Sequence, residues 1–89
     1  MTWLVEYTPR SAKAMRRLDR VVARRVFSAV ERLRDLDDPT ASCKALAGPL
    51  AGLWRLRVGD YRVILDVQRD RLVIVALDLG HRSTIYQDE

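Results

Sequence analysis

Hydrophobic and polar positions in the first half of the chain predict one strand followed by two helices. Residues 2–7 alternate between two faces, as a half-buried strand does. Thr8 and Pro9 then suit the N-cap and the first turn of a helix, and apolar positions recur at helical spacing over residues 9–18 and 21–36. The strand places Trp3, Val5 and Tyr7 on one face and Leu4 on the other, and the apolar stripe of the second helix comprises Val22, Val26, Ala29, Val30 and Leu33.

The second half of the chain has the two-residue period of strands. Residues 53–58 alternate strictly, residues 61–67 are rich in β-branched side chains, and residues 72–77 are almost wholly apolar. Gly59 and Asp60 separate the first two of these segments. A two-residue link with glycine first is the signal of a hairpin with a type II′ turn.

The order β-α-α-β-β-β predicts one α+β domain over residues 1–89. In this fold an N-terminal strand and an antiparallel two-helix hairpin precede a three- to four-stranded antiparallel sheet, which the helical hairpin covers. Residues 37–52, which include Gly48 and Pro49, read as the loop between the two halves. A chain of 89 residues buries only about 60% of the surface that its unfolded form exposes, so a stabilising partner is plausible.

The composition favours a small cytoplasmic protein with no membrane association. No stretch is apolar enough to cross a bilayer, and residues 1–6 lack the features of a signal peptide. Cys43 is the one cysteine, which excludes an intramolecular disulfide, and one cysteine with one histidine does not make a metal site. The formal net charge is +4, and all basic residues except Lys13 and Lys44 are arginine. Arginine suits bidentate contact with phosphate, so anionic partners are permitted, although a solvated basic surface gives the same charge.

A cluster of arginines follows from the predicted hairpin. If the turn has two residues, Arg57 lies directly opposite Arg62, and Arg55 shares their face of the sheet. Opposed like charges cost several tenths of a kcal/mol, which favours an anion bound between them. The alternative is that nearby acids, Asp60 and Asp66, neutralise the pair.

The C-terminal segment adds groups that could transfer protons. Gly80 allows the backbone to turn after the last strand, and His81 and Arg82 follow it. If the chain then runs back along the sheet, Tyr86 could come near Arg62. A histidine pKa near 6.5 suits proton transfer, although a histidine at a strand end is more often an ordinary surface residue.

Two segments of the chain resemble the RelE/ParE superfamily of toxins, specifically the RelE-like mRNA interferases. They are residues 53–63, with the core Arg-Val-Gly-Asp-Tyr-Arg-Val, and residues 80–86, with His-Arg followed four residues later by Tyr. The resemblance implies a type II toxin–antitoxin toxin that enters the ribosomal A site and cuts mRNA there. It implies a metal-free endoribonuclease without cofactors, in which the ribose 2′-OH attacks the adjacent phosphate and leaves a 2′,3′-cyclic end.

The resemblance also assigns roles to individual residues. Arg62 matches the family arginine that contacts the scissile phosphate, and Arg82 matches a second one. Tyr86 matches the tyrosine that orients or deprotonates the nucleophile.

Two positions depart from the family pattern. Arg55 and Arg57 stand where the best-known members carry lysines. Arginine stays protonated in proteins, so this pair can hold phosphates but is poorly suited to proton transfer. That task then falls to His81 or to Tyr86, whose phenol would need a pKa below its usual value of about 10.

The resemblance implies several partners. The first is a cognate RelB-like antitoxin, whose acidic wrapping segment would complement the positive charge of this chain. The others are the ribosome and its mRNA, with operator DNA contacted only through the antitoxin complex. Two other functions stay open: a ParE-like inhibitor of DNA gyrase, and a catalytically inactive nucleic-acid-binding homologue that survives in a repressor complex.

Overall fold

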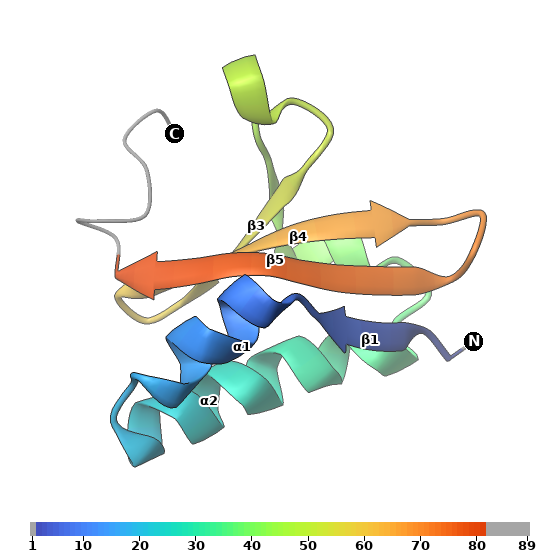
Figure 1. Ribbon diagram of the computed structural model, residues 1–89. Helices are drawn as coiled ribbons and strands as arrows, with labels where there is room; N and C mark the ends of the chain where they lie inside the picture. The colour runs from blue at the N-terminus through green and yellow to red at the C-terminus, as the bar shows by residue number, and fades with distance from the viewer. Residues whose placement is uncertain (1, 82–89) are drawn as a thin grey trace.

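The computed structural model describes residues 2–81 and shows an α+β fold with the predicted order of elements (Figure 1). The helices and first strand are β1 (Leu4–Tyr7), α1 (Pro9–Arg16) and α2 (Arg20–Glu31), followed by the 3-10 turns η1 (Arg32–Asp35) and η2 (Pro39–Ser42). The remaining elements are β2 (Lys44–Ala45), the 3-10 turn η3 (Gly48–Leu50), β3 (Trp54–Val58), β4 (Tyr61–Gln68) and β5 (Val73–His81).

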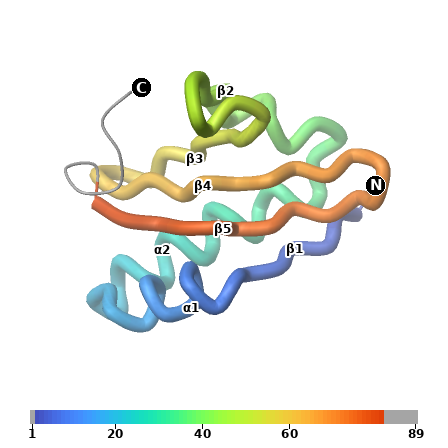
Figure 2. Tube along the Cα trace, turned by 45° about the horizontal axis from the view of Figure 1, so that its top comes forward, coloured from blue at the N-terminus to red at the C-terminus, as the bar shows by residue number. Residues whose placement is uncertain are grey.

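The five strands form one sheet in the order β1-β5-β4-β3-β2, with both helices on one side (Figures 1 and 2). The pairs β3–β4 and β4–β5 are antiparallel, as predicted, and β2, in a segment predicted to be a loop, also pairs antiparallel with β3. β1 instead pairs parallel with β5, from Leu4 opposite Val73 to Tyr7 opposite Ala76. The sheet is therefore mixed, and within residues 2–81 both α-helices lie on the same one of its two faces.

The helix-covered face holds the core. The predicted stripe of α2 is confirmed: Val26 and Val30 are fully buried, and Val22 at its start is partly buried. α1 packs mainly on β5 and α2 on β3. The core comprises Trp3, Val26, Ala29, Val30, Leu33, Leu56, Val58, Val63, Leu65, Ile74, Ala76 and Leu79.

A bulge in β5 fixes the helical hairpin onto the sheet. The register between β4 and β5 shifts between Ile64 and Leu65, so that Leu77 is an extra residue on β5. The hydroxyl of Thr8, the N-cap of α1, donates to the carbonyl of Leu77 at 2.8 Å, and the buried hydroxyl of Ser11 donates to that of Ala76 at 2.7 Å. Two short side chains at the start of α1 therefore satisfy carbonyl groups that the bulge turns toward the helix.

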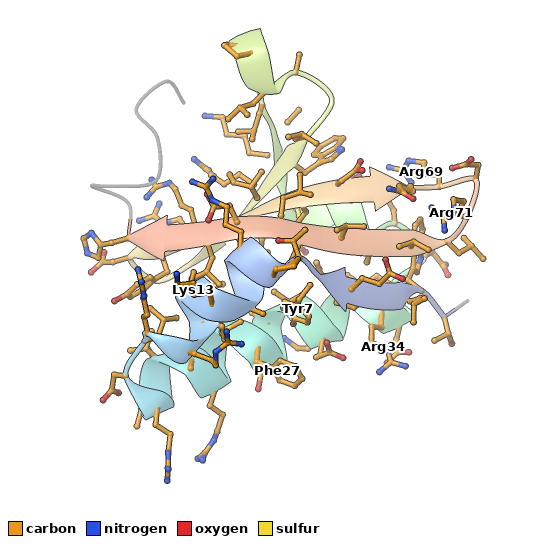
Figure 3. All side chains as sticks on the ribbon, in the orientation of Figure 1. Tyr7, Lys13, Phe27, Arg34, Arg69 and Arg71 are labelled. Atoms are coloured by element: carbon orange, nitrogen blue, oxygen red, sulfur yellow. The ribbon has the colours of Figure 1, made fainter. Side chains whose placement is uncertain are left out.

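A polar and aromatic contact joins β1 to α2. The rings of Tyr7 and Phe27 stack with centroids 6.0 Å apart, and Figure 3 shows the two side chains side by side. The Tyr7 hydroxyl donates to Glu31 at 3.4 Å, and Glu31 also accepts from Arg34. Burial, reinforced by the Glu31 carboxylate, raises the pKa of Tyr7, so the phenol stays protonated and continues to donate.

The second helix is shorter than predicted. It ends at Glu31 rather than near residue 36, and η1 continues as a tighter turn. The main-chain N–H of Trp3 binds the carbonyl of Arg34 at 2.9 Å, and its indole N–H binds the carbonyl of Leu36 at 3.1 Å. The carbonyl groups of Arg34 and Leu36 therefore accept hydrogen bonds from Trp3, at the start of the chain, instead of from a continued helix. The helical periodicity of the sequence does not predict this contact. Neither helix in residues 2–81 is long and apolar enough to span a membrane.

The last strand is longer than predicted. It continues through residues 78–81, where we expected a turn at Gly80. Gly80 pairs with Arg62 and has no positive φ, so the backbone stays extended there. Asp78 lies within this extended part of the strand, and its carboxylate forms an ion pair with Arg10 of α1 at 3.1 Å.

Candidate nucleic-acid interface

The turn between β3 and β4 sets the geometry of the site. Gly59 has φ +60°, whereas Asp60 has no positive φ, which is the pattern of the predicted type II′ turn. A Cβ at Gly59 would meet nothing within 4 Å, so the backbone conformation alone favours glycine. The register is confirmed, with Val58 opposite Tyr61 and each following pair as expected.

This register places three arginines on the face without helices. Arg57 lies directly opposite Arg62, and Arg55 lies opposite Ile64, which shares their face. The Arg57 side chain is exposed, and its Nε donates to the carbonyl of Gly59 at 3.3 Å. Arg55 and Arg62 are half-buried, and the Nε atoms of both, together with Nη1 of Arg62, are shielded from solvent. Partly desolvated guanidinium groups interact more strongly with an anion than fully hydrated ones do.

A fourth cation on this face was missed by the sequence analysis. Lys44 of β2 pairs with Arg55, so its exposed side chain projects to the same side of the sheet. The sequence predicts a loop here, because a strand of two residues is too short for its alternation to be recognised. The open-face cluster, as we call Lys44, Arg55, Arg57 and Arg62, thus extends across β2, β3 and β4.

Two carboxylates near this cluster have partners of their own. Asp78, which pairs with Ile64 across the strands, binds Arg10, and Asp66 accepts a hydrogen bond from the amide of Gln68 at 2.9 Å. Their charge is therefore shared with groups outside the open-face cluster. The arrangement suits a polyanion that follows the strands and places successive phosphates on successive cations.

The structure separates His81 from the arginines. His81 is the last residue of β5 and pairs with Tyr61, whose ring it meets edge-on with centroids 5.4 Å apart. Neighbouring residues of a strand project to opposite faces, and Gly80 is the residue opposite Arg62. His81 therefore belongs to the helix-covered side of the sheet. Arg82 and Tyr86 lie outside the described residues.

Residues 2–81 contain no group of three or more His, Cys, Asp or Glu side chains that could hold a metal ion. The half-buried thiol of Cys43 donates to the carbonyl of Pro39 at 3.5 Å. Burial, and then the charge of Asp38, raises the pKa of this thiol to about 11, so it is protonated at neutral pH.

Comparison with protein families identifies the chain. Residues 5–86 match the family described as the ParE toxin of type II toxin–antitoxin system, parDE. The chain belongs to this family. The RelE/ParE superfamily assignment that the two motifs implied is therefore confirmed, and the protein is the toxin of a type II toxin–antitoxin system. A comparison with curated proteins found no significant match in sequence.

The toxin is also similar to solved structures of RelE proteins. A chain of the RelE–RelB complex from Pyrococcus horikoshii OT3 is 30% identical, with a TM-score of 0.74 over 96% of the toxin and 100% of that chain. A chain of the toxin–antitoxin complex RelBE2 from Mycobacterium tuberculosis has a TM-score of 0.83 at 23% identity, over 93% and 94% of the two chains. The RelE toxin of E. coli, in the intact RelBE complex, has a TM-score of 0.70 at 18% identity, over 89% and 95%. The last two likenesses show the fold alone.

Proposed function

We propose that this toxin is a ribosome-dependent endoribonuclease that cuts mRNA in the ribosomal A site. The observation that supports the proposal is the open-face cluster, in which Arg57 and Arg62 are directly opposed. Two guanidinium groups on directly opposed residues bring positive charge together on one face, and one phosphate can accept hydrogen bonds from both.

The proposed reaction is an internal transfer at one phosphate. The ribose 2′-OH loses its proton and attacks the adjacent phosphorus, and the bond to the 5′-oxygen breaks as that oxygen gains a proton. The products are a 2′,3′-cyclic phosphate and a 5′-hydroxyl. The pentacoordinate transition state carries additional negative charge, which we assign to Arg62 and Arg82 for stabilisation. Arg55 and Arg57 hold the flanking phosphates.

Proton transfer needs a group other than these arginines, because guanidinium groups stay protonated. The sequence offers two candidates, His81 and Tyr86. Because His81 pairs with Tyr61 on the other face of the sheet, we assign Tyr86 as the group that deprotonates or orients the 2′-OH. No metal ion or cofactor takes part in the proposed reaction.

An antitoxin is the proposed partner of this toxin. Three similar structures, those from P. horikoshii, M. tuberculosis and E. coli, are complexes of a RelE toxin with its antitoxin. The net charge of +4 favours an acidic antitoxin segment. In this proposal the toxin acts in the cytoplasm, where the ribosome is, and contacts operator DNA only through the antitoxin.

The alternative is inhibition of DNA gyrase. The family description, ParE toxin, supports this alternative, because the match covers residues 5–86. A gyrase inhibitor needs no RNA chemistry, so the loss of positive charge from the open-face cluster should leave its toxicity largely intact.

A primer-extension assay separates the two functions. The purified toxin is added to ribosomes programmed with mRNA, and we expect a new cut in the A-site codon that is absent with naked mRNA. Arg62→Ala should slow cleavage by about 100-fold or more, and Tyr86→Phe should slow it as well. Arg24→Ala is the matched control, because it removes one exposed arginine from α2.

Two other results would contradict the nuclease. If the toxin arrests growth but cuts no mRNA, gyrase becomes the target to test by supercoiling assay. If it neither cuts nor arrests growth, the open-face cluster serves nucleic-acid binding only.

A further inference from the structure

The charge along β4 changes sign on the face that carries the open-face cluster. Alternate residues of this strand project to that face, namely Arg62, Ile64, Asp66 and Gln68. Arg62 lies next to the β3–β4 turn, and Asp66 lies four residues, or about 13 Å, further along the strand. An RNA strand that follows β4 therefore meets a cation first and a carboxylate next.

Two hydrogen bonds in series hold the Asp66 carboxylate, and we call them the Asp66 relay. The Gln68 amide donates to Oδ2 of Asp66 at 2.9 Å, and the Arg71 guanidinium donates to Oε1 of Gln68 at 3.1 Å. Arginine can only donate and a carboxylate can only accept, so the two neighbours fix which way the amide between them faces. The carboxylate is therefore oriented before any ligand binds.

One oxygen of this carboxylate is available to a ligand. Within residues 2–81, Oδ1 of Asp66 accepts no hydrogen bond, and the side chain is only half-buried. Asp66 pairs with Val75 of β5, whose half-buried side chain projects to the same face. The site thus combines an oriented acceptor with an apolar surface against which a flat ring can lie.

The negative charge of Asp66 suits a base rather than a phosphate. A carboxylate repels the RNA backbone, whereas the bases of a single strand can turn away from the phosphates and form hydrogen bonds along their edges. Adenine, cytosine and guanine each carry an exocyclic amino group that donates hydrogen bonds. Uracil has none, and the N–H on its pairing edge lies between two carbonyl oxygens that repel a carboxylate.

We propose that Asp66 reads one base of the bound RNA and selects a base with an exocyclic amino group over uracil. The amino group donates to Oδ1 of Asp66 while the ring lies against Val75. Gln68 is a positioning residue, because it orients the carboxylate without touching the RNA. The RNA is taken from the proposed function, and the selectivity comes from the Asp66 relay.

The test compares two short labelled RNA strands, oligocytidylate and oligouridylate. Their bases have the same size and carry an amino group in one and a carbonyl oxygen in the other at the same ring position. Binding to the toxin is measured by fluorescence anisotropy at low salt, without ribosomes. We expect oligocytidylate to bind about tenfold more tightly and to shift the amide NMR signals of Asp66–Gln68.

Asp66→Asn removes the charge and keeps the shape of the side chain. Its amide can present either an acceptor to cytosine or a donor to uracil, so the two strands should bind equally. Asp70→Asn is the matched control, because Asp70 is exposed in the β4–β5 turn and the same charge is lost. Both variants should bind both strands more tightly, but only Asp66→Asn should change the ratio of the two affinities.

Gln68→Leu tests the positioning role. It removes the hydrogen bond to Asp66 but leaves the carboxylate in place, so the preference for oligocytidylate should weaken without being abolished. A relay that only stabilises the turn would behave differently. In that case Gln68→Leu would lower the thermal stability and leave the ratio of the two affinities at its wild-type value.

Three results would overturn the proposal: equal affinity of the wild type for the two strands, an unchanged ratio in Asp66→Asn, and no binding of either strand at low salt. The assay is independent of cleavage. A toxin that cuts mRNA but binds both strands equally keeps the proposed nuclease activity and loses the base selectivity. A toxin that prefers oligocytidylate but cuts no mRNA loses the nuclease activity and keeps Asp66 as the residue that reads the base.

Discussion

The two faces of the sheet differ in the residues that they carry: the helix-covered face is apolar, whereas the open face presents arginines beside the buried Ile64. On the face covered by helices, residues such as Val63, Leu65 and Ile74 have no exposed surface. On the other face, Arg57 and Arg62 stand opposite each other, and like charges in cross-strand positions repel. One strand, β4, supplies residues to both faces in alternation. Neighbouring residues of the same strand therefore contribute either to stability or to the proposed function, depending on the face to which they project. A substitution can change one of these properties without changing the other.

The largest expected effect comes from the covered face. Leu65→Ala leaves a cavity in the centre of the core and should lower the free energy of unfolding by about 2–5 kcal/mol. Urea denaturation measures this change, with Leu4→Ala as the exposed control. A loss below about 1 kcal/mol would mean that the two faces differ less in packing than the burial of Leu65 indicates.

The next effect concerns the contact that fixes the helices to the covered face. Ser11→Ala removes the 2.7 Å hydrogen bond from the hydroxyl to the buried carbonyl of Ala76, which still accepts from the main-chain N–H of Thr8, and should cost about 0.5–1.5 kcal/mol of unfolding free energy. Ser28→Ala removes an exposed hydroxyl from α2 and should change stability little. Equal effects of the two substitutions would show that the bulge carbonyl does not depend on Ser11.

On the open face we expect the opposite sign. Arg57→Gln removes one member of the opposed pair and should raise the free energy of unfolding by a few tenths of a kcal/mol at low salt. The gain should shrink at about 1 M salt, because salt screens the repulsion. Arg24→Gln, on α2, is the control for the change in net charge. A loss of stability at low salt would mean that the Nε hydrogen bond of Arg57 to Gly59 outweighs the repulsion.

The smallest expected effect lies at the β4–β5 turn, where Figure 3 labels Arg69. The guanidinium of Arg69 forms an ion pair with Asp38 at 3.1 Å. Hydrogen bonds from the side chain of Thr40, and then from Arg69, lower the pKa of Asp38. The charged carboxylate thus stabilises the folded state above its ordinary pKa, and this contribution disappears as the pH falls through about 4 and below.

Thermal unfolding across pH tests this contribution. Wild type should be slightly more stable than Asp38→Asn at pH 7, and the difference should vanish in acid. Asp37→Asn, at an exposed neighbouring position, is the control. A difference that stays constant with pH would assign the effect to the hydrogen bonds rather than to the charge.

The sequence predicts the hairpin and its arginines well because the relevant rules are local. Gly59 fixes the turn, the turn fixes the register, and strand alternation then places Arg57 and Arg62 on one face. The parallel pairing of β1 with β5 involves residues far apart in the sequence, so no local rule reveals it. The apolar run of residues 72–77 was a signal of a central strand, since β5 lies between β1 and β4.

Two features of the site needed the structure. Lys44 joins the open-face cluster only because β2 pairs with β3, and a two-residue strand has no recognisable period. His81 lies on the covered side because β5 continues through Gly80, which the sequence suggested as a turn. Glycine permits a turn but does not require one.

The position of β1 also governs when this toxin can fold. Leu4, near the start of the chain, pairs with Val73, in the last strand. During synthesis β1 has no strand to pair with until β5 has been made, and contacts between such distant residues form slowly. The sheet therefore stays incomplete on the ribosome until β5 has been synthesised. A protein proposed to attack ribosomes thus completes its sheet only after β5 has left the ribosome that made it.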